Sequence, residues 1–145
     1  MSLLGGLTRE QLRAQYVEAW RKARAGETLT SHERMISETI ELHKEYHVIL
    51  DDKERALSHQ SDATAAVENP FLHLGLHLAV REQLTIDRPP GIRELAQQLC
   101  SRFGSHEGEH ALMQALGETL WEAQRNGRPP DERDYLRKAR ELLKR

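Results

Sequence analysis

The sequence has one cysteine, few aromatic residues and no long apolar run, and each shortage excludes a class of protein. Cys100 is the only cysteine among 145 residues, which excludes an internal disulfide framework and is typical of a reducing, cytoplasmic setting. No apolar stretch approaches the roughly 20 residues that a membrane-spanning helix needs. The first residues also lack the basic and apolar regions of a signal peptide. We therefore expect a cytoplasmic protein with no membrane partner.

Neither sign of charge dominates the chain. Its 21 lysines and arginines are nearly balanced by 23 aspartates and glutamates, for a net charge of -2. A nucleic-acid-binding protein would normally carry a clear basic excess, so we expect no nucleic-acid partner. Aromatic residues make up only 5% of the chain, so aliphatic side chains must fill most of the core. The length suits one domain covering residues 1–145.

The hydrophobic periodicity is helical along nearly the whole chain. Start signals such as a capping box or a proline, and stop signals such as glycine, divide it into segments. The sequence therefore predicts an all-α single domain of five to six helices packed as an irregular bundle. We expect residues 1–7 to form a flexible N-terminus and residues 58–68, which have no period, to form a surface loop. The boundary signals are Thr8 with Gln11, Gly26, Thr30 with Glu33, Asn69-Pro70, Gly104, Ser105, Asn126-Gly127 and Pro129-Pro130.

Histidine is the residue with an unusual pattern. Random placement of eight histidines in this chain would give about half of one pair at the i,i+4 spacing that stacks two side chains on a helix face. The sequence has three such pairs, each in line with the apolar face of its predicted segment. Whether the segment that carries the first pair is helical throughout residues 44–46 is left open by the sequence. The pairs are His43/His47, His73/His77 and His106/His110.

Two interpretations account for the pairs. A single inward pair is most simply a polar turn whose ring nitrogens bond to backbone carbonyls. Six inward imidazoles in one core would instead compete for acceptors when neutral and repel one another when charged. Neutral imidazole is a good ligand for transition metals. The six histidines of the three pairs therefore predict a site for one or two transition-metal ions, with Zn, Fe, Mn and Ni as candidates.

A two-ion site usually needs a carboxylate, and none falls cleanly on a histidine face. Glu118 is the nearest at ideal helix angles, so we take it as a candidate ligand or supporting partner. An open coordination position would permit a metal-dependent hydrolase or an oxidoreductase acting on an unidentified small molecule. The alternatives are a metal or redox sensor and a non-enzymatic helical interaction module whose histidines are structurally satisfied. A homo-oligomer is compatible with each of these.

One family resemblance covers nearly the whole chain. Its most specific block runs from Asn69-Pro70-Phe71-Leu72-His73 through His77-Leu78-Ala79 to Pro89-Pro90-Gly91-Ile92-Arg93, and it continues at His106, His110 and Leu116-Gly117-Glu118. With these residues the chain resembles a small bacterial family, domain of unknown function 1841. That family has no established function, so the resemblance implies no mechanism.

Overall fold

The structure is a computed structural model that describes residues 9–52, 56 and 70–145. All regular secondary structure within these ranges is helical, which confirms the predicted all-α class. The chain divides into two compact units, Met1–Leu78 and Ala79–Arg145. The expected flexible N-terminus and surface loop, and the start signals at Thr8 and Asn69, lie outside the described residues.

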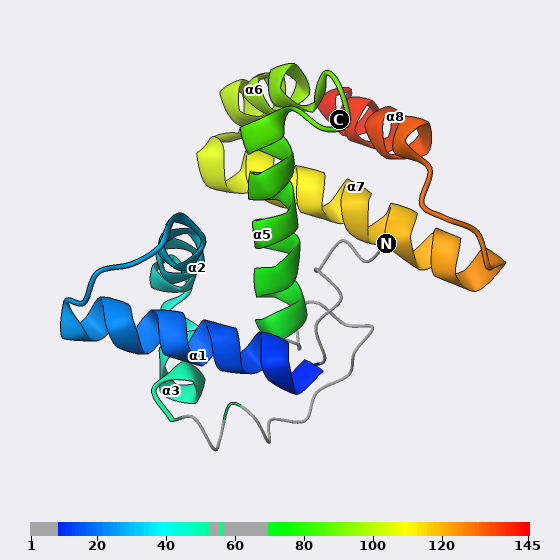
Figure 1. The fold of residues 1–145 in the computed structure, drawn as a ribbon. Coiled ribbons are helices and arrows are strands. Elements are labelled where there is room, and N and C mark those ends of the chain that lie inside the picture. Colours follow the sequence, from blue (N-terminus) through cyan, green and yellow to red (C-terminus); the bar gives the residue numbers. More distant parts are fainter. Residues whose placement is uncertain (1–8, 53–55, 57–69) are drawn as a thin grey trace. The chain divides into compact units, whose positions relative to one another are not determined.

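The described residues of the first unit form three helices, one 3-10 turn and the beginning of a fourth helix (Figure 1). Its elements are α1 (Arg9–Ala25), α2 (Ser31–Glu41), η1 (Lys44–Tyr46), α3 (His47–Leu50) and the first nine residues of α5 (Pro70–Ile86). The aliphatic and aromatic faces of these helices enclose one core. Its largest fully buried members are Tyr16, Ile36, Ile40 and Leu74.

Aromatic stacking joins α1 to the start of α5 within this unit. The Tyr16 and Phe71 rings are nearly parallel, with centroids 6.2 Å apart. The Arg13 guanidinium lies 4.3 Å from the centroid of Phe71. Proline at position 70 begins α5 as the sequence predicts, because its fixed φ suits the first helical turn and its missing N–H has no partner there in any helix.

Helix α2 begins where the sequence predicts and ends earlier than a continuous pattern would suggest. Thr30 and Glu33 form the predicted reciprocal capping box. Leu42 is the C-cap, and His43 leaves the helical region at φ -121° and ψ 73°. The segment is therefore not helical throughout, and His43 and His47 do not share one helix face.

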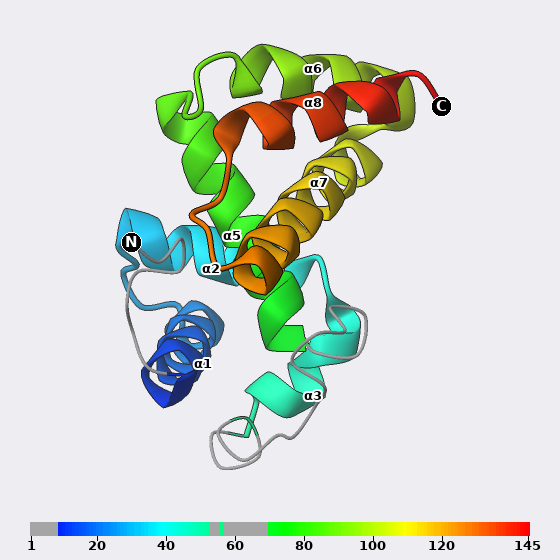
Figure 2. The same cartoon turned by 90° about the vertical axis from the view of Figure 1, so that its right-hand side faces the viewer.

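The second unit holds the end of α5 with α6 (Ile92–Phe103), α7 (Ser105–Asn126) and α8 (Glu132–Leu143), which pack on one another (Figure 2). Gly104 and Gly127, both at positive φ, end α6 and α7 as predicted. Ser105 was expected to cap α7, but Gly104 occupies the N-cap position and no side chain caps this end.

Close backbone packing joins α6 to α7 in the second unit. A Cβ added at Gly108 would lie 2.7 Å from the Cα, N and Sγ atoms of Cys100. Only glycine permits this approach, so the two helices pack almost backbone to backbone here. Burial, with a smaller contribution from the charge of Glu109, raises the pKa of the Cys100 thiol.

The described residues contain seven α-helices where five to six were expected. The short α3, which follows the break after α2, accounts for the difference. No helix in the described part of the chain is long and apolar enough to cross a membrane.

Candidate metal centre

The first turns of α5 present two histidines side by side. His73 and His77 lie one helical turn apart, and their Nε2 atoms are 3.1 Å from each other. His77 is fully buried at 0% exposure, and His73 is partly buried. The predicted stacking of this pair on one helix face is therefore present in the structure.

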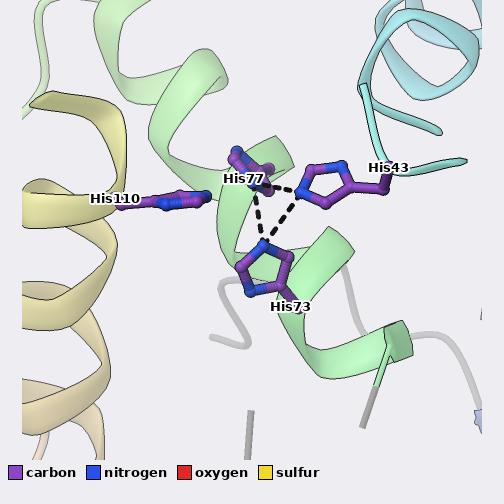
Figure 3. A group of neighbouring side chains, drawn as sticks. All are labelled: His43, His73, His77 and His110. Atoms are coloured by element: carbon purple, nitrogen blue, oxygen red, sulfur yellow. Dashed lines mark hydrogen bonds between the residues drawn. The ribbon is translucent and has the colours of Figure 1, made fainter. Parts of the chain in front are cut away.

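The third ring comes from the break after α2. The Nε2 atom of His43 lies 3.0 Å from that of His73 and 3.2 Å from that of His77 (Figure 3). We call His43, His73 and His77 the histidine triad. All three members belong to the first unit, and their rings meet edge to face with centroids 4.7 to 4.8 Å apart.

Two contacts orient the His43 ring. Its Nδ1 atom lies 2.7 Å from the carbonyl oxygen of Thr39, which can only accept a hydrogen bond, so Nδ1 carries the proton. In the neutral ring the Nε2 lone pair then points toward His73 and His77. The Tyr46 ring lies parallel to His43 at a centroid distance of 5.3 Å. Burial, and to a smaller extent the charge of Glu45, raises the pKa of the Tyr46 hydroxyl.

The three Nε2 contacts cannot all be hydrogen bonds. Each contact would need one N–H and one lone pair, and each Nε2 atom has one or the other. Among the three Nε2 atoms, at least two must therefore be of the same kind, either both donors or both acceptors, and the contact between those two is not a hydrogen bond. This holds for every tautomer and protonation state of the rings. Three lone pairs directed at one cation remove the conflict.

His47, the other member of the first predicted pair, is turned elsewhere. Its Nε2 atom donates a hydrogen bond to the carbonyl oxygen of Ile40 over 3.0 Å. Its ring packs on Trp20 with centroids 4.5 Å apart. The Nε2 atom thus caps the C-terminal end of α2, as the interpretation of a structurally satisfied histidine describes.

The third pair lies in the first turns of α7, in the second unit. His106 and His110 share one face of this helix, with ring centroids 4.1 Å apart. Glu107 places a carboxylate oxygen 3.9 Å from Nδ1 of His110. One ligand atom from each of these three residues lies within 4.8 Å of the other two.

The carboxylate expected as a ligand is on the surface. Glu118 is exposed, and its Oε1 accepts a hydrogen bond of 3.3 Å from Gln114 on the same helix. No Asp, Glu or Cys ligand atom groups with the histidine triad in the described part of the chain.

Three residues of these sites were not identified from the sequence as parts of them: Thr39, Tyr46 and Glu107. Thr39 stands four residues before His43. Its carbonyl accepts from the His43 ring at the point where α2 ends. Glu107 directly follows His106, and ideal helix angles place neighbouring side chains about 100° apart on the helix. Spacing along one helix face therefore misses Glu107. Tyr46 lies in η1, after the end of α2, so a continuous helical pattern does not place it against His43.

Comparison with known protein families gives a match over nearly the whole chain. The model of the family described as Domain of unknown function (DUF1841) matches residues 8–141. No curated protein and no solved structure matches the chain.

Proposed function

The chain belongs to that family, and from the geometry of the histidine triad we propose that it binds a transition-metal ion through the Nε2 atoms of His43, His73 and His77. The observation that carries the proposal is the mutual approach of three Nε2 atoms to between 3.0 and 3.2 Å. At least one of these contacts is repulsive without a cation. Burial of His77 and His43 makes such a contact more costly, because water cannot reach in to replace it.

The spacing fits a metal ion closely. Zinc–nitrogen bonds of about 2.0–2.1 Å at tetrahedral angles place two ligand nitrogens roughly 3.3–3.4 Å apart. The observed separations of 3.0, 3.1 and 3.2 Å differ from this by a few tenths of an ångström. Small ring rotations close that difference. The hydrogen bond from His43 to Thr39 supports the site in addition, since a ligating histidine usually donates its other N–H to a carbonyl or carboxylate.

The donor set separates the candidate metals into those that imidazole suits and those that prefer oxygen ligands. Three neutral imidazoles suit Zn, Fe, Ni or Cu ions, whereas Mn, Mg and Ca prefer oxygen ligands. No carboxylate among the described residues accompanies the triad. The tetrahedral spacing of the three nitrogens suits Zn²⁺, so Zn²⁺ is the ion to test first, with Fe²⁺, Ni²⁺ and Cu²⁺ as the competing ions.

Three protein ligands are typical of a metal site whose fourth coordination position is open to water or substrate. A bound metal there would act as a Lewis acid toward a water or substrate molecule. The protein would hold the ion through the triad, orient His43 through Thr39 and Tyr46, and shield the site by burial. A metal-dependent hydrolase and an oxidoreductase both fit this arrangement, and so does a sensor that binds the same ion without turnover.

Metal content of the untagged full-length protein tests the proposal. After loading with ZnCl₂ and extensive dialysis, elemental analysis should give one tightly held equivalent of zinc. The His73→Gln and His77→Gln variants should lose that equivalent, and His32→Ala should keep it, because His32 is an exposed histidine outside the triad. Tight binding that survives in both triad variants, or its absence in the wild type, would refute the proposal.

The carboxylate predicted as a ligand, Glu118, is tested in the same experiment. We expect Glu118→Gln to retain the zinc, because the carboxylate of Glu118 is exposed and bonded to Gln114.

A further inference from the structure

The second unit carries a histidine pair of its own, and we propose that His106, Glu107 and His110 form a second, weaker site for a borderline divalent cation such as Zn²⁺, Ni²⁺ or Cu²⁺. The three residues lie within the first two turns of α7 and belong to the second unit, whereas the histidine triad belongs to the first. The proposal therefore does not depend on metal binding by the triad.

The spacing of the two histidines makes them a chelating pair. Side chains four residues apart on a helix lie one turn above each other on the same face. The rings of His106 and His110 are already in contact, with centroids 4.1 Å apart and planes inclined by 61°. Each ring needs only a change of side-chain torsion to direct a nitrogen at a common ion.

Glu107 supplies a negative charge at the N-terminal end of α7. The N-terminal end of a helix carries a partial positive charge that disfavours a cation. Glu107 offsets it, with Oε1 3.9 Å from Nδ1 of His110, and can serve as a third ligand. Imidazole nitrogen with one carboxylate oxygen is a donor set found in zinc sites.

The exposure of these side chains determines how tightly we expect the second site to bind its ion. His106 and Glu107 are exposed and His110 is only partly buried, so water completes the coordination and competes with the protein ligands. The side chains must also lose rotamer freedom on binding. We therefore expect a site that exchanges its ion during dialysis, in contrast to the tight binding proposed for the triad.

Zinc titration of the untagged full-length protein by isothermal calorimetry tests this site. The wild type should bind a second, weaker equivalent. His106→Ala should lower the affinity for that second equivalent. The loss should exceed the roughly 10–100-fold that follows when a residue supporting a metal ligand, and not the ligand itself, is removed. His32→Ala is the matched control, because it removes an exposed histidine that has no histidine four residues before or after it.

The site also has a local spectroscopic signature. In NMR spectra, zinc added beyond the tightly bound equivalent should shift the ring nitrogen resonances of His106 and His110 together. The His73→Gln variant should show the same shifts. If the second, weaker equivalent of zinc binds equally well to His106→Ala and His32→Ala, the proposal is overturned. A loss of both equivalents in His73→Gln would also overturn it, because the two sets of ligands would then form one site.

Discussion

Histidines with the same spacing along the chain have different surroundings in this protein, and the hydrogen bond of one ring nitrogen makes the difference. In His43 the Nδ1 atom donates to Thr39, which leaves Nε2 directed at His73 and His77. In His47 the Nε2 atom itself donates to the carbonyl of Ile40. The first ring is therefore prepared to bind a metal through Nε2, whereas the second closes a helix end.

This difference predicts that His47→Ala will lower stability and leave the zinc content of the protein unchanged. The variant loses the hydrogen bond to Ile40 and the packing on Trp20. The Ile40 carbonyl keeps the hydrogen bond from the backbone N–H of His43, so the lost hydrogen bond should cost about 0.5–1.5 kcal/mol. Urea unfolding gives the stability, and elemental analysis after dialysis gives the zinc content. A variant with normal stability and no zinc would instead make His47 a ligand.

A glycine provides the second prediction at this scale. In Gly108→Ala the new Cβ would lie 2.7 Å from the backbone N and Cα of Cys100, which cannot turn aside as a flexible side chain could. We expect a loss of about 1–3 kcal/mol in unfolding free energy from the forced separation of α6 and α7.

The control for this change is Gln114→Ala, an exposed position on the same helix. It should stay within about 0.5 kcal/mol of the wild type in the same denaturation experiment. A Gly108→Ala protein as stable as the control would show that α6 and α7 adjust freely at this contact.

At the scale of elements, acid should destabilise helix α8. Lys138 on α8 contacts Glu122 on α7 and Asp134 on its own helix. The ammonium of Lys138, followed by the guanidinium of Arg137, lowers the pKa of the Asp134 carboxyl below its ordinary value of 3.8. A lowered pKa in the folded state means that the ionised carboxylate stabilises the fold.

That contribution is present above pH 3.8 and is lost as the pH falls through the lower pKa of the folded state. Asp134→Asn should therefore unfold at lower urea than the wild type at pH 6, and the difference should shrink progressively as the pH is lowered below 3.8. Glu132→Gln, an exposed acid in the same first turn, is the control. A difference that persists unchanged into acid would show that Asp134 acts through packing and not through its charge.

Most helix boundaries followed from local chemistry and could be predicted. Pro70, Gly104, Gly127 and the capping box at Thr30 act through φ preferences or hydrogen bonds within a few residues. Local rules are sufficient for such signals. The same holds for His73 and His77, since both lie on one regular helix whose geometry follows from its spacing.

The end of α2 could not be predicted in this way. The Lys44 position carries a good helix former, and no glycine or proline lies nearby. At its end the His43 ring donates to the carbonyl of Thr39, and the carbonyl of Ile40 accepts both the backbone N–H of His43 and the ring of His47. Contacts with α5 and with Trp20 hold these rings in place. The meeting of His43 with α5 depends on this tertiary arrangement and left no local signal.

At the scale of the whole molecule, a metal ion in the triad would act as a cross-link within the first unit. It would join the end of α2, through His43, to α5 through His73 and His77, across 30 residues of sequence. Because the three nitrogens converge only in the folded state, binding free energy becomes folding free energy. Metal binding and stability should therefore rise and fall together.

Thermal unfolding in the presence of zinc checks this coupling. Free Zn²⁺ at about 100 times its dissociation constant should add about 2.7 kcal/mol of stability. At about 2–4 °C per kcal/mol for a chain of this size, Tm should rise by roughly 5–11 °C. His77→Gln should lose most of the rise and His32→Ala should retain it, since only the first of these changes touches the triad. A rise of equal size in both variants would place the stabilising ion elsewhere, and the pair on α7 would then be the first site to examine.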